Sequence, residues 1–315
     1  MMNLDYQIDG PEGAPVIVLS NSLGTTRSMW QPQLGALTAR FRVLRYDTHG
    51  HGQTAKSGKV TLAQLGEDVI TLLDHLQIEK AWFCGISMGG LTGLWLGRFA
   101  PERFYAIAVA NTAARIGDQA SWLSRARAVR QEGMDVVAAG AADRWFSHAF
   151  RQKAPEVVAS LCHQLTHSDA EGYAACCEAL AAADLRSEVG HISLPTLIIA
   201  GESDPVTTVA DANFLHQQIP ASQVVVVSAS HLSNIEAAGA FRRRITGFLP
   251  GRAAWMTRRV ISREWRYDVR CWAMPTSTAR WISLPRSMKS FRTLLPATRG
   301  AKPGPDRGWN AILAA

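Results

Sequence analysis

Ser87 lies in the sequence GISMG of residues 85–89, directly after an apolar run at residues 81–84. The run predicts a short buried strand and residues 91–97 predict a helix, which places Ser87 on a tight turn between them. Glycine on either flank lets the backbone bend and lift the serine hydroxyl into a cleft. Helix N-terminal N–H groups would then face any anion that forms beside it. Because GxSxG also occurs by chance, the case for Ser87 as a nucleophile depends on its partners.

Two further polar residues follow predicted strands in the same manner. Asp204 lies in the loop after the apolar run 195–200, and His231 lies in the loop after the run 224–227. In a parallel sheet these loops converge on one edge, so the chain order Ser87, Asp204, His231 predicts a catalytic triad. His231 would take the serine proton, and Asp204 would fix its tautomer and stabilise the imidazolium. The alternative is that Asp204 caps a helix and His231 is an ordinary loop residue.

A serine hydrolase also needs two N–H donors for the oxyanion that forms during attack. Met88, which follows the nucleophile, is expected to supply one of them. The loop after the strand 15–20 supplies the other, and Leu23 is our candidate there, with Ser22 as the neighbouring alternative.

The remaining apolar segments predict the frame that positions these loops. Strands are expected at 15–20, 41–46, 81–84, 106–110, 195–200 and 224–227, and helices in the stretch up to 39, at 62–76 and at 235–248. Alternating strands and helices predict an α/β fold with a mostly parallel sheet and helices on both faces. Residues 117–185 are helical in pattern without strands, and we expect a helical cap above the strand ends, where such sheets bind ligands.

Several residues of the predicted cap and of a nearby turn have two interpretations. Arg144 and Trp145 could line the pocket, with Arg144 paired to a substrate carboxylate, or Arg144 could be solvated beside core aromatics. Arg115 has the same two interpretations. His49 and His51 lie in a glycine-rich turn, for which we expect a structural role and not metal ligation.

Charge divides the chain into two unequal parts. Residues 251–315 hold 13 basic and 3 acidic residues, a net charge of +10, which leaves 20 basic and 23 acidic residues and a net charge of −3 for residues 1–250. Any charge argument for nucleic-acid binding would rest on residues 251–315 alone.

No apolar run approaches the roughly 20 residues that span a bilayer, and the first residues do not form a signal peptide. The five cysteines follow no metal or disulfide spacing, so we expect a cytoplasmic protein.

Together these segments resemble the α/β-hydrolase family and, within it, the 3-oxoadipate enol-lactonases. The resemblance rests on residues 19–25, 45–48, 84–93, 111–117, 144–146, 171–173, 182–186 and 229–236. It implies hydrolysis of a five-membered enol-lactone that carries a carboxylate, giving 3-oxoadipate through an acyl-enzyme. It further implies a small-molecule partner and neither cofactor nor metal, and leaves the oligomeric state open. The alternatives are another serine α/β-hydrolase, such as a carboxylesterase or cofactor-free perhydrolase, and a hydrolase-fold binding protein.

Residues 251–315 depart from this family. They lack helical or strand periodicity and are rich in Arg, Trp, Ser and Pro. Residues 270–281 and 298–309 can be back-translated so that a neighbouring reading frame resembles 4-carboxymuconolactone decarboxylase, the enzyme that makes the enol-lactone. We therefore expect a hydrolase domain at 1–250 and an irregular basic tail that is not a native domain, with no membrane or nucleic-acid partner. The alternative is a genuine basic tail that binds one of them.

Overall fold

The computed structural model describes residues 4–55 and 59–249. Seven strands form one sheet in the order β1-β3-β2-β4-β5-β6-β7. The strands are β1 (Tyr6–Asp9), β2 (Val16–Ser20), β3 (Arg42–Tyr46), β4 (Ala81–Ile86), β5 (Phe104–Ala110), β6 (Thr196–Gly201) and β7 (Ser222–Val227). Every neighbouring pair is parallel except β1 with β3. The predicted α/β class is therefore confirmed.

The strand β1 was not expected from the sequence. Its four residues pair antiparallel with β3 at the sheet edge, and none of them is fully buried. The central strands β4 and β6 are by contrast buried at every position, which matches the continuous apolar runs of strands covered on both faces. A short, half-exposed edge strand lacks such a run, and the sequence pattern therefore misses it.

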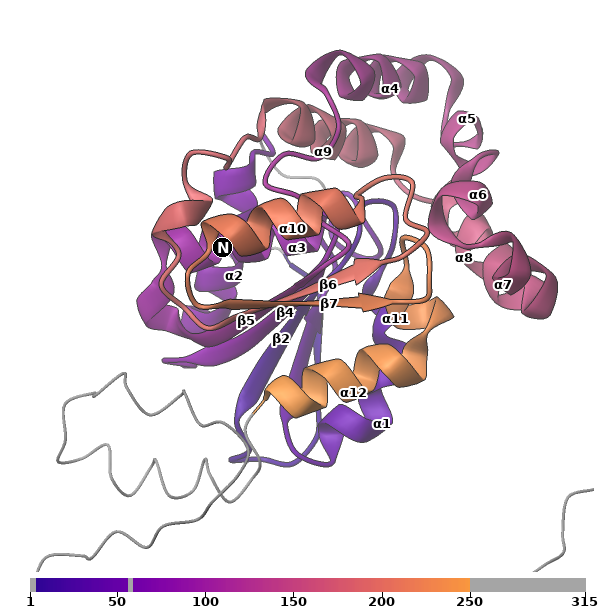
Figure 1. Ribbon diagram of the computed structural model, residues 1–315. Helices are drawn as coiled ribbons and strands as arrows, with labels where there is room; N and C mark the ends of the chain where they lie inside the picture. Colours follow the sequence, from indigo (N-terminus) through magenta and orange to yellow (C-terminus); the bar gives the residue numbers. More distant parts are fainter. Residues whose placement is uncertain (1–3, 56–58, 250–315) are drawn as a thin grey trace, which may run out of the picture. The chain divides into compact units, whose positions relative to one another are not determined.

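Helices cover both faces of the sheet (Figure 1). α1 (Gln31–Thr38) and α12 (Ala238–Phe248) lie on one face, and α2 (Leu62–His75), α3 (Met88–Phe99) and α10 (Val209–Gln218) lie on the other. The helix expected at 235–248 is in fact two, α11 (Ser233–Glu236) and α12. The backbone leaves helical angles at Ala237, with φ −111° and ψ 42°. Just before this break, Asn234 donates to the Met29 carbonyl, and Glu236 accepts the N–H groups of Ser147 and Ser230.

The helical insertion, which we define as α4–α9, joins β5 to β6. It contains α4 (Gln119–Glu132), α5 (Asp135–Ala138), α6 (Ala141–Trp145), α7 (His148–Lys153), α8 (Pro155–Thr166) and α9 (Ala170–Ala182). Short 3-10 turns at Arg27–Trp30, Pro101–Arg103 and Val189–His191 complete the secondary structure of the described residues. Figure 1 shows α4–α8 set apart from the sheet, with α9 between α4 and the rest of the body.

Contact between α9 and the body depends on two glycines. A Cβ on Gly50 would lie 2.2 Å from the Cα of Gly172, and a Cβ on Gly172 would lie equally close to the Cα of Gly50. Any larger residue at either position would separate the two backbones. The two glycines therefore set how closely α9 approaches the glycine-rich turn that contains Gly50.

The expected boundary at residue 250 and the tail 251–315 lie outside the described residues. Within the part of the chain that the structure describes, no helix is long and apolar enough to cross a membrane.

Candidate active site

Ser87 occupies the turn between β4 and α3, as the sequence predicts. Its backbone angles are φ 56° and ψ −116°, a conformation that costs a non-glycine residue about 1–3 kcal/mol. The neighbouring strand holds it there, because the Ser87 N–H donates to the Ala110 carbonyl (2.9 Å) and the Thr112 hydroxyl donates to the Ser87 carbonyl (2.8 Å). The strained turn therefore depends on the end of β5.

The glycines that flank this turn have no room for a side chain. A Cβ on Gly85 would lie 2.1 Å from the carbonyl oxygen of Gly89, and a Cβ on Gly89 would lie 2.4 Å from that of Ser20. The Gly89 N–H also donates to the Asn21 carbonyl (3.0 Å). The start of α3 is thus fastened to the loop that follows β2, which brings the two predicted oxyanion donors to one place.

Asp204 and His231 lie side by side at the neighbouring strand ends. His231 Nδ1 is 3.0 Å from Asp204 Oδ1 and 2.8 Å from Oδ2, and the side chains are 4% and 0% exposed. Because an ionised carboxylate only accepts hydrogen bonds, Nδ1 carries the proton and Nε2 is left free to accept one. This is the tautomer that a general base for a serine requires.

Four other donors hold the Asp204 carboxylate. Oδ1 accepts the N–H groups of Val206 (2.8 Å) and Thr207 (3.1 Å), and Oδ2 accepts the Thr207 hydroxyl (2.7 Å) and Asn111 Nδ2 (3.0 Å). Burial by itself would raise the pKa of Asp204, but the hydrogen bond and charge of His231 and the bonds from Asn111 and Thr207 outweigh it. The pKa therefore lies below its usual value, and the carboxylate is ionised beside the imidazole.

Asn111 is a part of the site that the sequence prediction missed. It follows β5 at a positive φ of 45° and donates to both Asp204 and the Ser230 carbonyl (3.1 Å). Its Oδ1 accepts the Ser233 hydroxyl (2.5 Å). A polar residue directly after a buried strand was the only signal available, and it is shared by many loop residues.

Ser87 follows β4, and β5 separates β4 from β6, the strand that precedes Asp204. The aligned ends of the strands bring its turn beside Asn111, since Ile86 pairs with Ala110 and Ala110 with Ile199. Among the described residues, the Ser87 hydroxyl makes no hydrogen bond to His231 or to any other group. Such bonds are often long in the absence of substrate and tighten when it binds.

The N–H of Leu23 is oriented by the atoms around it. The Ser22 carbonyl, in the same peptide unit, accepts the Thr25 N–H (3.2 Å) and the Thr25 hydroxyl (2.7 Å). Because the C=O and N–H of a trans peptide point in opposite directions, the Leu23 N–H points away from Thr25. The Ser22 N–H donates to the Met29 sulfur (3.4 Å). Of the two alternatives left by the sequence, the geometry favours Leu23.

The backbone N–H groups of Leu23 and Met88 donate no hydrogen bond within the described chain. Both residues are buried, and an unmet buried N–H is costly. Two such donors on adjoining segments, beside the Ser87 turn, fit an anion that is present only during reaction.

The helical insertion packs over the loop that carries Leu23. The Trp145 carbonyl accepts the Leu232 N–H (3.0 Å), directly after His231. A Cβ on Gly24 would lie 3.2 Å from the Tyr173 ring, 3.7 Å from the Trp145 ring and 2.6 Å from a Leu165 methyl. Aromatic groups of α6 and α9 therefore cover the loop that carries Leu23.

Arg144 is half-buried at the end of α6 and donates to the Val137 carbonyl (2.5 Å). Burial lowers the pKa of Arg144, and the charge of Arg125 on α4 lowers it further. Burial raises the pKa of Tyr173 to about 12, although Arg125 and Arg144 oppose that shift. Neither arginine pairs with a carboxylate of the described chain. Arg115 lies 3.7 Å from the Asp184 carboxylate and is already paired.

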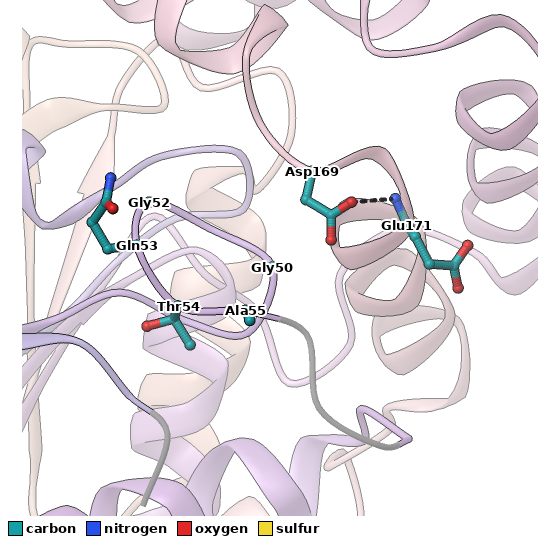
Figure 2. A pocket seen from close by; sticks show the side chains of 7 residues that line it. All are labelled: Gly50, Gly52, Gln53, Thr54, Ala55, Asp169 and Glu171. Carbon is teal, nitrogen blue, oxygen red and sulfur yellow. Dashed lines mark hydrogen bonds between the residues drawn. The ribbon is translucent and has the colours of Figure 1, made fainter.

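A separate surface hollow of about 450 Å³ lies between the glycine-rich turn and the start of α9 (Figure 2). Its lining includes Asp169, which accepts the Glu171 N–H (3.2 Å), and Glu171 itself. None of the predicted catalytic or oxyanion residues lines it. This hollow is therefore not our candidate site.

Both histidines of the turn contact neighbouring residues. His49 Nε2 lies 2.7 Å from Asp68, and His51 accepts the Gly24 N–H (2.9 Å). The structural role expected for both is consistent with these contacts. Cys176 and Cys177 are buried free thiols on α9.

Comparison with known proteins agrees with this architecture. The sequence profile of the alpha/beta hydrolase fold family matches residues 15–238. The chain belongs to the α/β-hydrolase family. It is 51% identical over 246 residues to 3-oxoadipate enol-lactonase 1 of Acinetobacter baylyi, an alignment that covers 78% of this chain and 92% of that protein.

Solved structures of α/β-hydrolases superpose on the same part of the chain. The enol-lactonase from Burkholderia xenovorans LB400 is 48% identical, with a TM-score of 0.76 over 78% of this chain and 95% of its own. A thermophilic esterase from Thermogutta terrifontis is 26% identical, with a TM-score of 0.72 over 81% of this chain and 93% of its own. The prediction of an α/β-hydrolase similar to enol-lactonases is confirmed.

Proposed function

We propose that this α/β-hydrolase opens 3-oxoadipate enol-lactone to 3-oxoadipate through an acyl-enzyme on Ser87. The observation that carries the proposal is the high identity to enol-lactonases along nearly their whole length. The site adds independent support, because Asp204 and His231 are paired and buried, and they follow β6 and β7 of the same sheet in which Ser87 follows β4.

The first half of the reaction forms the acyl-enzyme. Ser87 Oγ attacks the lactone carbonyl carbon while His231 Nε2 takes the hydroxyl proton, and Asp204 stabilises the imidazolium. The carbonyl oxygen becomes an oxyanion between the N–H groups of Leu23 and Met88. When this intermediate collapses, the ring C–O bond breaks and His231 returns the proton to the departing enol oxygen. The enol oxygen is a better leaving group than an alkanol oxygen because its anion is stabilised by resonance, and the released enol then tautomerises to the ketone.

The second half releases the product. His231 accepts a proton from a water molecule, whose oxygen attacks the acyl carbon, and the same two N–H groups bind the second oxyanion. The Ser87 oxygen leaves with the proton from His231, which regenerates the enzyme. Acylation and deacylation together consume one water molecule, and the protons of both steps move through His231.

The carboxylate of the substrate requires a cation, and Arg144 is our candidate. The charges of Arg144 and Arg125 both act on Tyr173 and lower its pKa, and neither arginine has a carboxylate partner in the described chain. Two half-buried like charges raise each other's energy, and a bound carboxylate would relieve that repulsion. Trp145, whose ring covers Gly24, would pack on the lactone. Arg115 is the weaker candidate because Asp184 already neutralises it.

Two further assignments belong to the same proposal. We place the enzyme in the cytoplasm, which its four free thiols within the described residues support. We also retain residues 1–250 as the hydrolase domain, with α4–α9 as its cap and residues 251–315 outside it.

The decisive experiment follows the loss of enol-lactone absorbance with purified protein. Native protein should consume the lactone much faster than a p-nitrophenyl ester, and Ser87→Ala should lose on the order of 10⁴-fold or more in kcat. Ser87→Ala should keep the native circular dichroism spectrum, because its turn is held by backbone bonds and not by the hydroxyl. A variant with a tenth of native activity would remove Ser87 from the mechanism, and preference for the ester would make the enzyme a carboxylesterase.

A further inference from the structure

The loop after β2 is held at each of three consecutive peptide units. The N–H of Ser22 donates to the Met29 sulfur, and the carbonyl of Ser22 accepts two bonds from Thr25. The third unit joins Leu23 to Gly24, and its N–H donates to His51 Nε2 (2.9 Å). Gly24 has a positive φ of 77°. Because glycine adopts many backbone conformations at little cost, the bond to His51 is needed to hold this last unit in one of them.

His51 can accept this bond in one protonation state only. Its Nδ1 lies 2.9 Å from the His49 carbonyl, which can only accept, so Nδ1 carries a proton. Its Nε2 receives the Gly24 N–H, so Nε2 carries none. The ring is therefore neutral, with the proton on Nδ1. Burial, the largest influence, lowers the pKa of His51, and nearby His49 lowers it too, whereas Asp47, Asp169 and the His49 carbonyl act in the opposite direction.

The surroundings of His51 keep the ring in place. It is 1% exposed, and its ring centroid lies 6.3 Å from that of Tyr173 on α9. The turn that carries it closes on itself through bonds from the His51 N–H to the Thr48 carbonyl (2.9 Å) and from the Thr54 N–H to the His51 carbonyl (3.0 Å). A rigid acceptor is thus presented to a flexible peptide unit.

We propose that His51 is a positioning residue for catalysis, which aims the Leu23 N–H at the oxyanion by holding the adjoining Leu23–Gly24 peptide unit. The inference rests on the proposed serine-hydrolase mechanism with Leu23 as a donor. His51 would thus help to stabilise the transition state, although it lies outside the triad and does not contact the substrate.

The test compares an acceptor with a non-acceptor at the same position. His51→Gln places an oxygen where Nε2 lies and should keep most activity, whereas His51→Leu should lose roughly 10- to 100-fold in kcat with little change in KM. That range lies below or at the 10²–10³ cost of removing an oxyanion donor outright, because Thr25 still holds the Leu23 unit. Affinity for a boronic acid, whose tetrahedral adduct needs the oxyanion site, should fall by the same factor as kcat.

A matched control separates positioning from stability. His49→Gln changes the other buried histidine of the turn, whose side chain faces Asp68 on α2 and not the loop. All rates are divided by the active-site concentration obtained by titration with a p-nitrophenyl phosphonate. If the inference is right, His49→Gln should leave kcat per titrated site unchanged, whatever it does to the melting temperature. If His51→Leu lowers only the melting temperature and leaves kcat and boronate affinity per site unchanged, the inference is wrong.

A second measurement needs no variant to fold. Nitrogen-15 spectra of the native protein should show His51 with a protonated Nδ1 and a bare Nε2 at neutral pH. A protonated Nε2 would overturn the inference.

The kinetic comparison uses both the lactone and a p-nitrophenyl ester. Turnover of the ester alone would refute the proposed substrate while the His51 effect is still measured on the ester.

Discussion

Replacing Asp204 by asparagine should reverse the tautomer of His231. Asp204 Oδ1 accepts two backbone N–H groups, from Val206 and Thr207. An asparagine must keep its oxygen at this position, because an NH₂ group there would face two fixed donors. Its NH₂ group therefore takes the place of Oδ2, 2.8 Å from His231 Nδ1. The retained oxygen lies 3.0 Å from Nδ1, but the NH₂ group would be the closer of the two. It would donate to Nδ1 and shift the ring proton to Nε2, which then cannot accept a proton from Ser87.

The magnitude follows from the loss of the general base. The same exchange in a serine protease triad costs about 10⁴-fold in kcat, which corresponds to about 5.4 kcal/mol at 1.36 kcal/mol per factor of ten. We expect a loss of the same order for Asp204→Asn. The new NH₂ group would also oppose Asn111 Nδ2, now 3.0 Å from Oδ2, and one unsatisfied buried donor should lower the free energy of unfolding by about 1–3 kcal/mol.

The assay measures kcat from the loss of lactone absorbance and stability from urea unfolding. Thr207→Val is the matched control, since it removes the hydroxyl bond to Oδ2 (2.7 Å) without changing the charge of Asp204 or its contact with His231. It should cost about 1 kcal/mol of stability and only a few-fold in kcat. The reasoning is refuted if Asp204→Asn keeps a tenth of native activity, or if Thr207→Val loses as much activity as Asp204→Asn.

Three further predictions concern other parts of the molecule. Arg144→Ala should raise KM for the lactone by roughly 10- to 150-fold, the effect of about 1.5–3 kcal/mol, and leave KM for a neutral ester nearly unchanged; equal effects on both substrates would exclude Arg144 as the anchor. Removal of residues 251–315 should leave lactone turnover and the melting temperature essentially unchanged, and a drop of several degrees would show that they belong to the fold. Burial lowers the pKa of His51, so the stability that His51 contributes is present above its usual pKa of 6.5 and is lost as pH falls. The hydrogen bond to Asp68 raises the pKa of His49, so the stability that His49 contributes is complete below pH 6.5 and is lost as pH rises. In urea titrations from pH 5 to 8, His51→Gln should therefore flatten the acid side of the stability profile and His49→Gln the neutral to alkaline side.

The sheet and the positions of the triad candidates could be predicted because both depend on local patterns. Continuous apolar runs marked β4 and β6, and the polar residue after each strand marked Ser87, Asp204 and His231. Parallel pairing then brings the strand ends together without further information. What the pattern could not supply was β1, which is short and half-exposed, and the break at Ala237 between α11 and α12.

The hydrogen bonds that support the site were beyond the reach of the sequence for a different reason. Asn111 reaches Asp204 across 93 positions, and Gly24 reaches His51 across 27. Neither contact follows a helix or strand period. The choice of Leu23 over Ser22 likewise depends on which carbonyl Thr25 holds. Such contacts are set by the approach of loops in three dimensions, and a single sequence does not specify them.

The end of α12, the last described helix, is held by residues from the N-terminal part of the chain. Helix α12 is the last described element, and helix C-termini leave carbonyl groups without partners in the helix. Arg40, which follows α1, donates to two of them, the carbonyls of Thr246 and Leu249, each at 3.1 Å. Phe241 of α12 is fully buried beside Trp30, with ring centroids 6.1 Å apart. The end of α12 is thus satisfied by residues of the N-terminal part of the chain, which is why loss of residues 251–315 should leave the sheet edge that carries His231 intact.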